Sequence, residues 1–336
     1  MAHIIFSEGS GVVDSKFGKV QTPIKMIIKD RVEAFEANSM IPTLFKEIKS
    51  NHWAENYRSD TAMDNWEAVG ENGDHPTNGY EEAFDKTIPN TTWKSQFSIS
   101  REIMDDSVTN ELQGRPAKFA TAYMRTREIF AAQLYGNALK GNATFKNGVY
   151  TFDTKTADGQ NLFSKTHKLS ASSKTVSNMF ADAASNDAIL YMESAMQDFR
   201  DDNGNILDIR PDTILIPNDA KLKKDILGAI GAEQDPDVSA SNAFNINYGR
   251  WNVVIWPYLN EFVTAGTHPY IMLDSQYNKN YGGAIFQNRV GMEVTSKVED
   301  NDANTWKGYA RFGGAFVDFR FAAIGGVSGG TQLISG

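Results

Sequence analysis

Residues 93–99 read Trp-Lys-Ser-Gln-Phe-Ser-Ile, an alternation of apolar and polar side chains that predicts a β-strand with one apolar face. Just before it, residues 58–92 have little apolar continuity and hold several turn signals, namely Asn72-Gly73, Pro76, Asn78-Gly79 and Pro89-Asn90. Aromatic residues on both sides of the turns, Trp66 before them and Tyr80 and Phe84 after them, favour a long two-stranded ribbon. Such a ribbon exceeds the usual loop length and has no core of its own. It needs a surface outside itself, which indicates a protein that assembles.

The composition is that of an ordinary globular protein, with 336 residues, 41% hydrophobic and 22% charged. Cysteine is absent, which excludes a disulfide framework, thiolate metal sites and a cysteine nucleophile. The net charge of −9 argues against electrostatic binding of nucleic acid by the chain as a whole. The start of the chain lacks a basic segment followed by an apolar one, and Asp318 and Arg320 interrupt the most apolar window. We therefore expect neither a targeting segment nor a membrane partner.

Four stretches have apolar residues at helical spacing, at 24–35, 41–48, 116–140 and 188–199. Pro42 fits the first turn of the second helix, and Pro116 fits the first turn of the third, which is the longest. Residues 1–22 show neither helical nor strand periodicity, and we interpret them as an extended arm.

Short apolar runs predict strands at 213–216, 251–256, 270–273, 284–286, 290–298, 306–312 and 316–323. Asn218 is a candidate N-cap for a helix that carries Leu222, Ile226 and Ile230. Because the helices and strands are interspersed without a regular βαβ rhythm, the predicted fold class is α+β.

Residues with catalytic or metal-binding chemistry are present, but not in a working pattern. The five histidines lie far apart, and the acidic run 198–204 lacks the register of a calcium loop. Paired carboxylates are expected by chance among 42 acidic residues. We therefore predict no catalytic, cofactor-binding or metal-binding residue, no cofactor and no enzyme activity. Asp318 and Arg320, two residues apart on the last predicted strand, are interpreted as a structural ion pair.

Six short stretches occur in a particular order between residues 158 and 320. They read DGQNLFSKTH (158–167), DNGNIL (202–207), PDTILIP (211–217), NVVIWPYL (252–259), YIMLD (270–274) and GYARFGGAFVDFR (308–320). Their sequence patterns and their order resemble those of the major head subunits of Mu-like tailed phages, and the resemblance spans about residues 60–325.

This resemblance implies the HK97-like capsid fold, an α+β fold with two domains and two extensions. The implied parts are an N-arm with N-terminal helices (1–57), an extended E-loop β-ribbon (58–100), a peripheral domain with a long spine helix (101–179), an axial domain (180–286), and return strands of the peripheral domain with the C-terminus (287–336).

The resemblance also implies a function, that of a structural major capsid protein that self-assembles into an icosahedral virion shell. Hexamers and pentamers of the chain would enclose double-stranded DNA without sequence-specific binding, and the negative net charge suits a wall that does not grip DNA. A scaffold, a portal and decoration proteins are expected partners, and synthesis is expected in the host bacterial cytoplasm. Trp66, Tyr80, Phe84 and Trp93 are expected at contacts between subunits, because aromatic side chains anchor interfaces.

Two alternatives stay open at this point. An encapsulin-type nanocompartment shell shares the fold and would carry an internal groove for a cargo peptide. A glycan-active enzyme would hold two carboxylates about 5–10 Å apart in a pocket, with the pKa of one of them raised.

Overall fold

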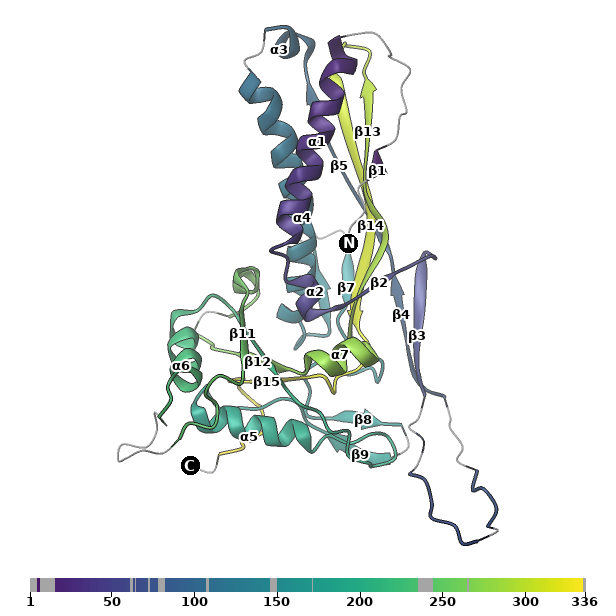
Figure 1. Cartoon of the computed structure of the whole chain (residues 1–336), viewed down its shortest axis with the longest axis vertical. Helices are drawn as coiled ribbons and strands as arrows, with labels where there is room; N and C mark the ends of the chain where they lie inside the picture. Colours follow the sequence, from purple (N-terminus) through teal and green to yellow (C-terminus); the bar gives the residue numbers. More distant parts are fainter. Residues whose placement is uncertain are drawn as a thin grey trace.

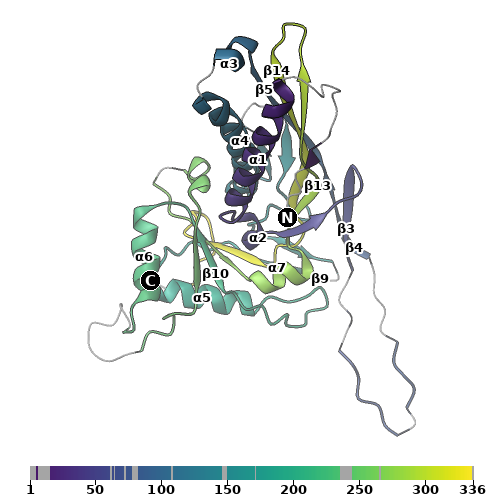
Figure 2. The same ribbon diagram turned by 45° about the horizontal axis from the view of Figure 1, so that its top comes forward.

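The structure is a computed structural model of the chain that combines helices with several β-sheets. It describes residues 5–6, 16–60, 63, 65–71, 73–77, 82–106, 109–145, 150–170, 172–234, 244–264 and 266–334. Figure 1 shows an elongated molecule in which a long sheet stands beside two helices. A smaller sheet with its own helices lies at one end of this layer, and a ribbon projects from the same end, as the turned view in Figure 2 also shows.

The long sheet is built around a hairpin of two strands, β13 (Ala284–Val298) and β14 (Asn304–Phe316). Strand β5 (Thr91–Ile99) pairs antiparallel with β14, from Ile99 opposite Asn304 to Thr91 opposite Phe312. On the other side, β1 (Ile5–Phe6) and β2 (Lys46–Lys49) both run parallel to β13 and share its free edge.

Two long helices, α1 (Lys16–Glu36) and α4 (Thr109–Gly136), pack against each other and against the long sheet. The buried positions Ile24, Ile28 and Val32 of α1 share a cluster with Phe119 and other residues of α4. Burying each of these aliphatic side chains contributes roughly 1.5–3 kcal/mol. The short helices α2 (Ile41–Leu44) and α3 (Arg101–Asp106) flank this layer.

The smaller sheet has the strand order β11 (Asn252–Ile255), β10 (Thr213–Ile216), β12 (Tyr270–Leu273) and β15 (Ala322–Gly325). Its helices are α5 (Asn186–Gln197), α6 (Ala220–Gly231), the 3-10 helix η1 (Pro257–Glu261) and α7 (Ser275–Tyr281). Side-chain oxygens of Ser185, Asp219 and Asp274 cap α5, α6 and α7 by accepting hydrogen bonds from backbone N–H groups of their first turns.

Three two-stranded hairpins complete the described elements. They are β3 (Ala54–Asp60) with β4 (Glu82–Pro89), β6 (Asn142–Thr144) with β7 (Thr151–Asp153), and β8 (His167–Leu169) with β9 (Ser172–Val176). The first of these hairpins is the base of the projecting ribbon in Figure 1.

The predicted fold class, α+β, is confirmed, and so are several elements. The strands predicted at 213–216 and 270–273 have the predicted bounds, and the alternating stretch 93–99 lies within β5. The helix predicted at 188–199 corresponds to α5, and Asp219, one residue after the candidate Asn218, caps α6.

Five predictions of local structure are wrong. The helix predicted at 41–48 is only the short α2, because residues 46–49 form β2 on the edge of β13. Residues 16–22 are helical rather than extended, because α1 packs on α4 despite the low helix propensity of Gly18 and Pro23. The long helix begins at Thr109 rather than at Pro116, which lies inside α4. The stretches 284–286 and 290–298 form one strand, so the expected domain boundary after residue 286 falls inside β13. Residues 317–321 are not a strand, and β15 joins the smaller sheet.

Candidate functional site: the ribbon and its polar base

The ribbon, defined here as residues 54–89, has a buried base and an exposed tip. Its strands pair from Ala54 opposite Pro89 to Asp60 opposite Glu82. Ile88 at the base is buried in a small cluster with Ile285 and Ala315 of the long sheet. Between the two strands, every residue that the structure describes is exposed. The ribbon is therefore anchored at one end and has no core at the other.

Hydrogen bonds fix the base of the ribbon to the long sheet. The hydroxyl of Tyr57 accepts a hydrogen bond from Nε2 of the fully buried Gln287 at 2.8 Å. Nδ2 of Asn90 donates to Oγ of Ser50 at 2.7 Å and to the carbonyl of His52 at 2.9 Å. Burial raises the pKa of Tyr57, which keeps its hydroxyl neutral. The first strand of the ribbon thus leaves the body at a fixed position.

The four aromatic residues expected at subunit contacts lie in different environments. Trp66 at the tip is 97% exposed, and Phe84 at the base is half-buried. Tyr80 lies outside the described residues. Trp93 stacks on Phe312 of its own chain, with ring centroids 4.9 Å apart and an angle of 7° between the planes.

Trp93 faces the interior because β5 pairs with β14, which sets it opposite Ala310 and against Phe130 of α4. The structure therefore uses Trp93 inside the subunit, and its role in a contact between subunits stays a prediction. Of the four residues, Trp66 is the large apolar side chain that the structure leaves unburied at the ribbon tip.

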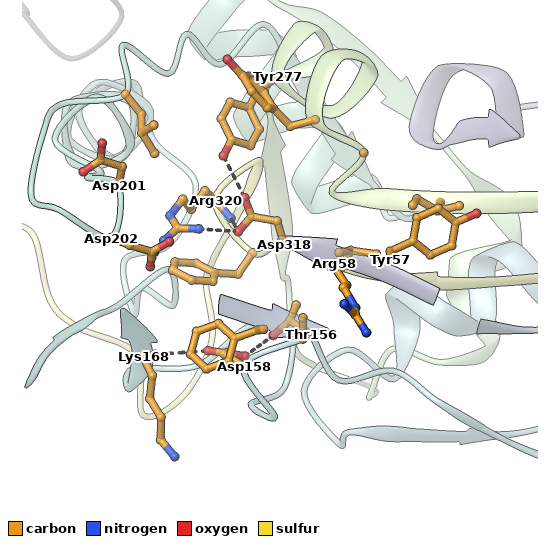
Figure 3. A pocket seen from close by; sticks show the side chains of 18 residues that line it. Tyr57, Arg58, Thr156, Asp158, Lys168, Asp201, Asp202, Tyr277, Asp318 and Arg320 are labelled. Atoms are coloured by element: carbon orange, nitrogen blue, oxygen red, sulfur yellow. Dashed lines mark hydrogen bonds and ion pairs between the residues drawn. The ribbon is translucent and has the colours of Figure 1, made fainter. Parts of the chain in front are cut away.

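A polar pocket of about 390 Å³ lies between the ribbon base and the smaller sheet (Figure 3). The ribbon contributes Tyr57, Arg58 and Phe84, and α7 contributes Tyr277. Three turns complete the wall and bring in the charged residues Asp158, Asp201, Asp202, Asp318 and Arg320. The pocket therefore joins segments that are far apart in the sequence.

Arg320 is the central cation of this pocket. Its guanidinium contacts Oδ1 of Asp202 at 3.0 Å and Oδ1 of Asp318 at 3.2 Å, and Nε donates to the carbonyl of Arg200 at 3.2 Å. The hydroxyl of Tyr277 donates to Oδ2 of Asp318 at 2.8 Å. Burial alone would lower the pKa of Arg320, but the negative charge of Asp318 and Asp202 outweighs it and raises the pKa.

The structure thus brings Asp318 and Arg320 together, but not across a strand. They lie in the turn between β14 and β15, where Asp318 also accepts a hydrogen bond from the backbone N–H of Arg320 at 3.2 Å. Asp202, the second carboxylate that contacts Arg320, comes from a turn that is 118 residues away from Arg320 in the chain. Sequence spacing indicated the first two residues, whereas nothing local indicated Asp202 or Tyr277.

A second buried charge pair closes the stretch 158–167. Nδ1 of His167 lies 2.8 Å from Oδ2 of Asp158, Nε2 lies 3.1 Å from the carbonyl of Leu162, and the ring stacks on Phe319. Both ring nitrogens therefore lie within hydrogen-bond distance of an oxygen atom. Burial alone would raise the pKa of Asp158, but hydrogen bonds from His167 and Thr156 lower it to about 2.

These contacts describe a structural joint rather than a catalytic site. A glycosidase would need a carboxyl with a raised pKa in the pocket, whereas the pKa of Asp158 is lowered, and Asp202 and Asp318 are both ion-paired with Arg320. Burial raises the pKa of Glu128, but this residue belongs to α4, where it is bonded to Ser39 and Trp256, and it is not among the pocket residues.

Within the described residues, no group of three or more His, Asp or Glu side chains is placed to hold a metal ion. None of the helices in these ranges is both long enough and apolar enough to cross a bilayer.

The arrangement of sheets and helices is that of the HK97-like capsid fold. The chain is similar to the solved structure titled Microbacterium phage Oxtober96 (10% identity, 88% of this chain and 91% of that one, TM-score 0.51). It is also similar to the capsid of Cyanophage P-SCSP1u (8% identity, 88% of each chain, TM-score 0.52) and to Mycobacterium phage Patience (11%, 99% and 96%, TM-score 0.50). At these identities the likeness establishes the fold alone.

The family follows from the sequence itself. The family described as "Phage capsid protein" matches residues 85–325, which is well over half of the chain. The chain therefore belongs to the phage capsid protein family, and it is a structural shell protein. No protein with a curated description matches it.

Proposed function

We propose that this chain is the major capsid protein of a tailed phage head and that it is most similar to Mu-like head subunits. Copies would assemble as hexamers and pentamers into a closed icosahedral virion shell around double-stranded DNA. The observation that carries the proposal is the ribbon, whose described tip is exposed throughout and whose Trp66 is 97% exposed. Such an element gains stability only against another chain.

The parts of the subunit are assigned as follows. The five-stranded sheet with α1 and α4 would be the peripheral domain, with α4 as its spine helix, and the four-stranded sheet with α5 and α6 would be the axial domain. The ribbon would be the E-loop. We keep the domain divisions after residues 57, 100, 179 and 286 in outline. β13 spans the division after residue 286, and β15, which follows that division in the sequence, pairs with β12 of the four-stranded sheet.

The remaining features of the proposal concern partners and place. A scaffold, a portal and decoration proteins would assist assembly, which would take place in the host bacterial cytoplasm. The chain would have no enzyme activity, a proposal supported by the pairing of Arg320, the central cation of its polar pocket, with Asp202 and Asp318.

Negative-stain electron microscopy and sedimentation of the expressed chain, alone and together with the scaffold encoded beside its gene, test this proposal. Closed shells of one size are the expected result. Protein that stays monomeric under every condition would contradict it. An encapsulin-type shell would instead assemble without a scaffold and would contain a cargo protein rather than DNA.

A further inference from the structure

The net negative charge of the chain is concentrated in one part of the ribbon. Residues 59–85 contain eight Asp or Glu and no Lys or Arg. The other 309 residues contain 33 Lys or Arg against 34 Asp or Glu, so the rest of the chain is close to neutral. The net charge of −9 therefore belongs to the ribbon, and it does not prevent another surface of the subunit from binding a polyanion.

A basic groove lies between α1 and α4. It has a volume of about 350 Å³, and its charged residues are Arg31 of α1 and Lys118 and Arg125 of α4. All three side chains are exposed, and none lies within 4 Å of a carboxylate among the described residues. The other residues that line it are small, namely Ala117, Thr121 and Ala122. The groove thus presents three positive charges and an open floor to a ligand from outside the subunit.

The packing of the two helices fixes these cations in place. Ala120 and Met124 of α4 are buried in the cluster that α4 shares with α1, so the side of α4 that carries Lys118 and Arg125 faces solvent. Lys118 and Arg125 are seven residues apart, which is two helical turns or about 10 Å along the axis. Figure 1 shows α1 and α4 side by side, away from the ribbon tip. The groove is therefore a basic strip on two packed helices, separate from the acidic ribbon.

We propose that this groove binds the phosphate backbone of the double-stranded DNA that the shell encloses. The inference rests on the proposed function and names the surface of the subunit that holds the DNA. Duplex DNA carries about one negative charge for each 1.7 Å of its axis, so the roughly 10 Å between Lys118 and Arg125 meets about six phosphates. Cations that pair with phosphates release condensed counterions, which drives the association at low salt.

The shape and the chemistry of the groove favour phosphates over bases. Base edges lie about 8 Å deep in the major groove of duplex DNA, where a concave protein surface does not reach, whereas phosphates line the outside of the duplex. Arg31, Lys118 and Arg125 supply charge, and the described lining holds no aromatic ring on which an unpaired base could stack. The hydroxyl of Thr121 donates to the carbonyl of Ala117 at 2.9 Å and is thus used within α4. We therefore expect double-stranded DNA of any sequence to bind equally.

The salt dependence of DNA binding by the full-length chain tests the groove. The logarithm of the binding constant falls with the logarithm of the salt concentration by about 0.9 for each phosphate that is neutralised. Lys118→Gln/Arg125→Gln should therefore make this slope shallower by about 1.8 and weaken the binding of a random-sequence duplex about tenfold at low salt. Fluorescence anisotropy of the labelled duplex measures both. The matched control is Lys221→Gln/Lys224→Gln on α6, which removes two exposed lysines outside the groove and should leave the slope unchanged.

Chemical labelling of native particles gives a second readout that needs no substitution. Lys118 carries an exposed amine in the subunit, so an amine-acylating reagent should modify it in empty shells. Phosphates bound in the groove should slow this labelling several-fold in DNA-filled particles. Lys221 on α6 should react equally in both kinds of particle. Mass spectrometry of the digested protein measures the ratio for each lysine.

The outcomes separate this inference from the proposed function. A salt slope that Lys118→Gln/Arg125→Gln leaves unchanged, or equal labelling of Lys118 in filled and empty particles, would overturn DNA binding by the groove and leave the shell function standing. A glutamate-rich peptide that competes as well as a duplex of equal charge would also overturn it, because the groove would then take an acidic protein segment. Failure of the native chain to form particles under any condition would overturn the proposed function.

Discussion

The molecule contains two long antiparallel hairpins that differ in burial and in charge. The hairpin β13–β14 has paired residues from Ala284 opposite Phe316 to Val298 opposite Asn304, and its inward side chains are among the largest fully buried ones. The ribbon β3–β4 pairs over a shorter span, buries Ile88 at its base, and then continues as an exposed segment. One hairpin is covered by helices of the same chain, whereas the described residues at the tip of the other are exposed.

Charge separates the two hairpins as sharply as burial does. Residues 284–316 carry four basic and four acidic side chains, whereas residues 59–85 carry eight acidic and no basic ones. A neutral, buried hairpin is stabilised by its own subunit. An acidic, exposed one repels itself, and an oppositely charged surface would stabilise it. We therefore expect the β13–β14 hairpin to stabilise the folded subunit and the ribbon to act in assembly.

Truncation of a buried ring in the β13–β14 hairpin should have the largest effect on the isolated subunit. Phe312 is 1% exposed and contacts Trp93, Phe286 and Phe130. Phe312→Ala should lower the free energy of unfolding by about 3–5 kcal/mol, as core cavities of this size do. Urea unfolding followed by tryptophan fluorescence measures it. Leu227→Ala, at a 45% exposed position, should cost under about 1 kcal/mol; equal losses would refute the contrast.

The joint at the ribbon base should be nearly as sensitive as the core. Arg320→Met leaves Asp202 and Asp318 without their cation in a site where their side chains are 9% and 20% exposed. The free energy of unfolding should fall by about 3 kcal/mol, because an unpaired buried charge is costly. Thermal unfolding of the variant measures the loss.

The control for this joint is an exposed pair of the same type. Arg210 and Asp208 are paired with side chains that are 75% and 70% exposed, so Arg210→Met should cost under about 1 kcal/mol. Adding Asp202→Asn to Arg320→Met should recover part of the loss. A loss no larger for Arg320→Met than for Arg210→Met would mean that the pocket does not hold the ribbon base to the body.

The sequence predicted elements well where burial was local and continuous. β10 and β12 are four-residue runs that are buried at every position, and their bounds were predicted correctly. β13 was divided because Gln287 and Asn288 interrupt its apolar pattern. Those polar residues lie where β2 joins the edge of β13, and Gln287 bonds to the ribbon through Tyr57. Polar residues inside this strand are explained by neighbours that no local pattern shows.

The candidate site was only half predictable for the same reason. Asp318 and Arg320 are two residues apart and could be seen together, but Asp202 is brought to them by the fold alone. Trp66 and Trp93 look equivalent as aromatic residues near predicted turns. Their burial differs because Trp93 lies on β5, which pairs with β14 more than 200 residues away in the sequence, whereas Trp66 lies at the exposed ribbon tip.

Acid should weaken the buried contact between Asp158 and His167. The ordinary pKa of Asp158 is near 3.8, and its pKa in the folded chain is lowered to about 2. A lowered pKa contributes stability that is present above the unfolded value and is lost as the pH falls through the folded one, here between about pH 4 and pH 2. The loss should be roughly 2 kcal/mol.

Because other carboxylates titrate in the same range, the comparison must be made with Asp158→Asn. Urea unfolding of both proteins at pH 5, 3 and 2 should give a difference in stability that shrinks as the pH falls. A difference that stays constant across this range would show that Asp158 and His167 do not act as an ion pair in the folded chain.

The smallest effect on folding should come from the most exposed aromatic side chain, and it should coincide with a large effect on assembly. Trp66 is 97% exposed, so Trp66→Ala should change the free energy of unfolding of the isolated subunit by less than about 0.5 kcal/mol. The same variant should assemble far less, because a buried tryptophan is a typical anchor of an interface. Thermal unfolding and sedimentation of one preparation measure the two effects side by side. For Phe312→Ala we expect the opposite, a large loss of folding stability. A Trp66→Ala chain that formed shells as readily as the native chain would show that the ribbon tip is not an assembly contact.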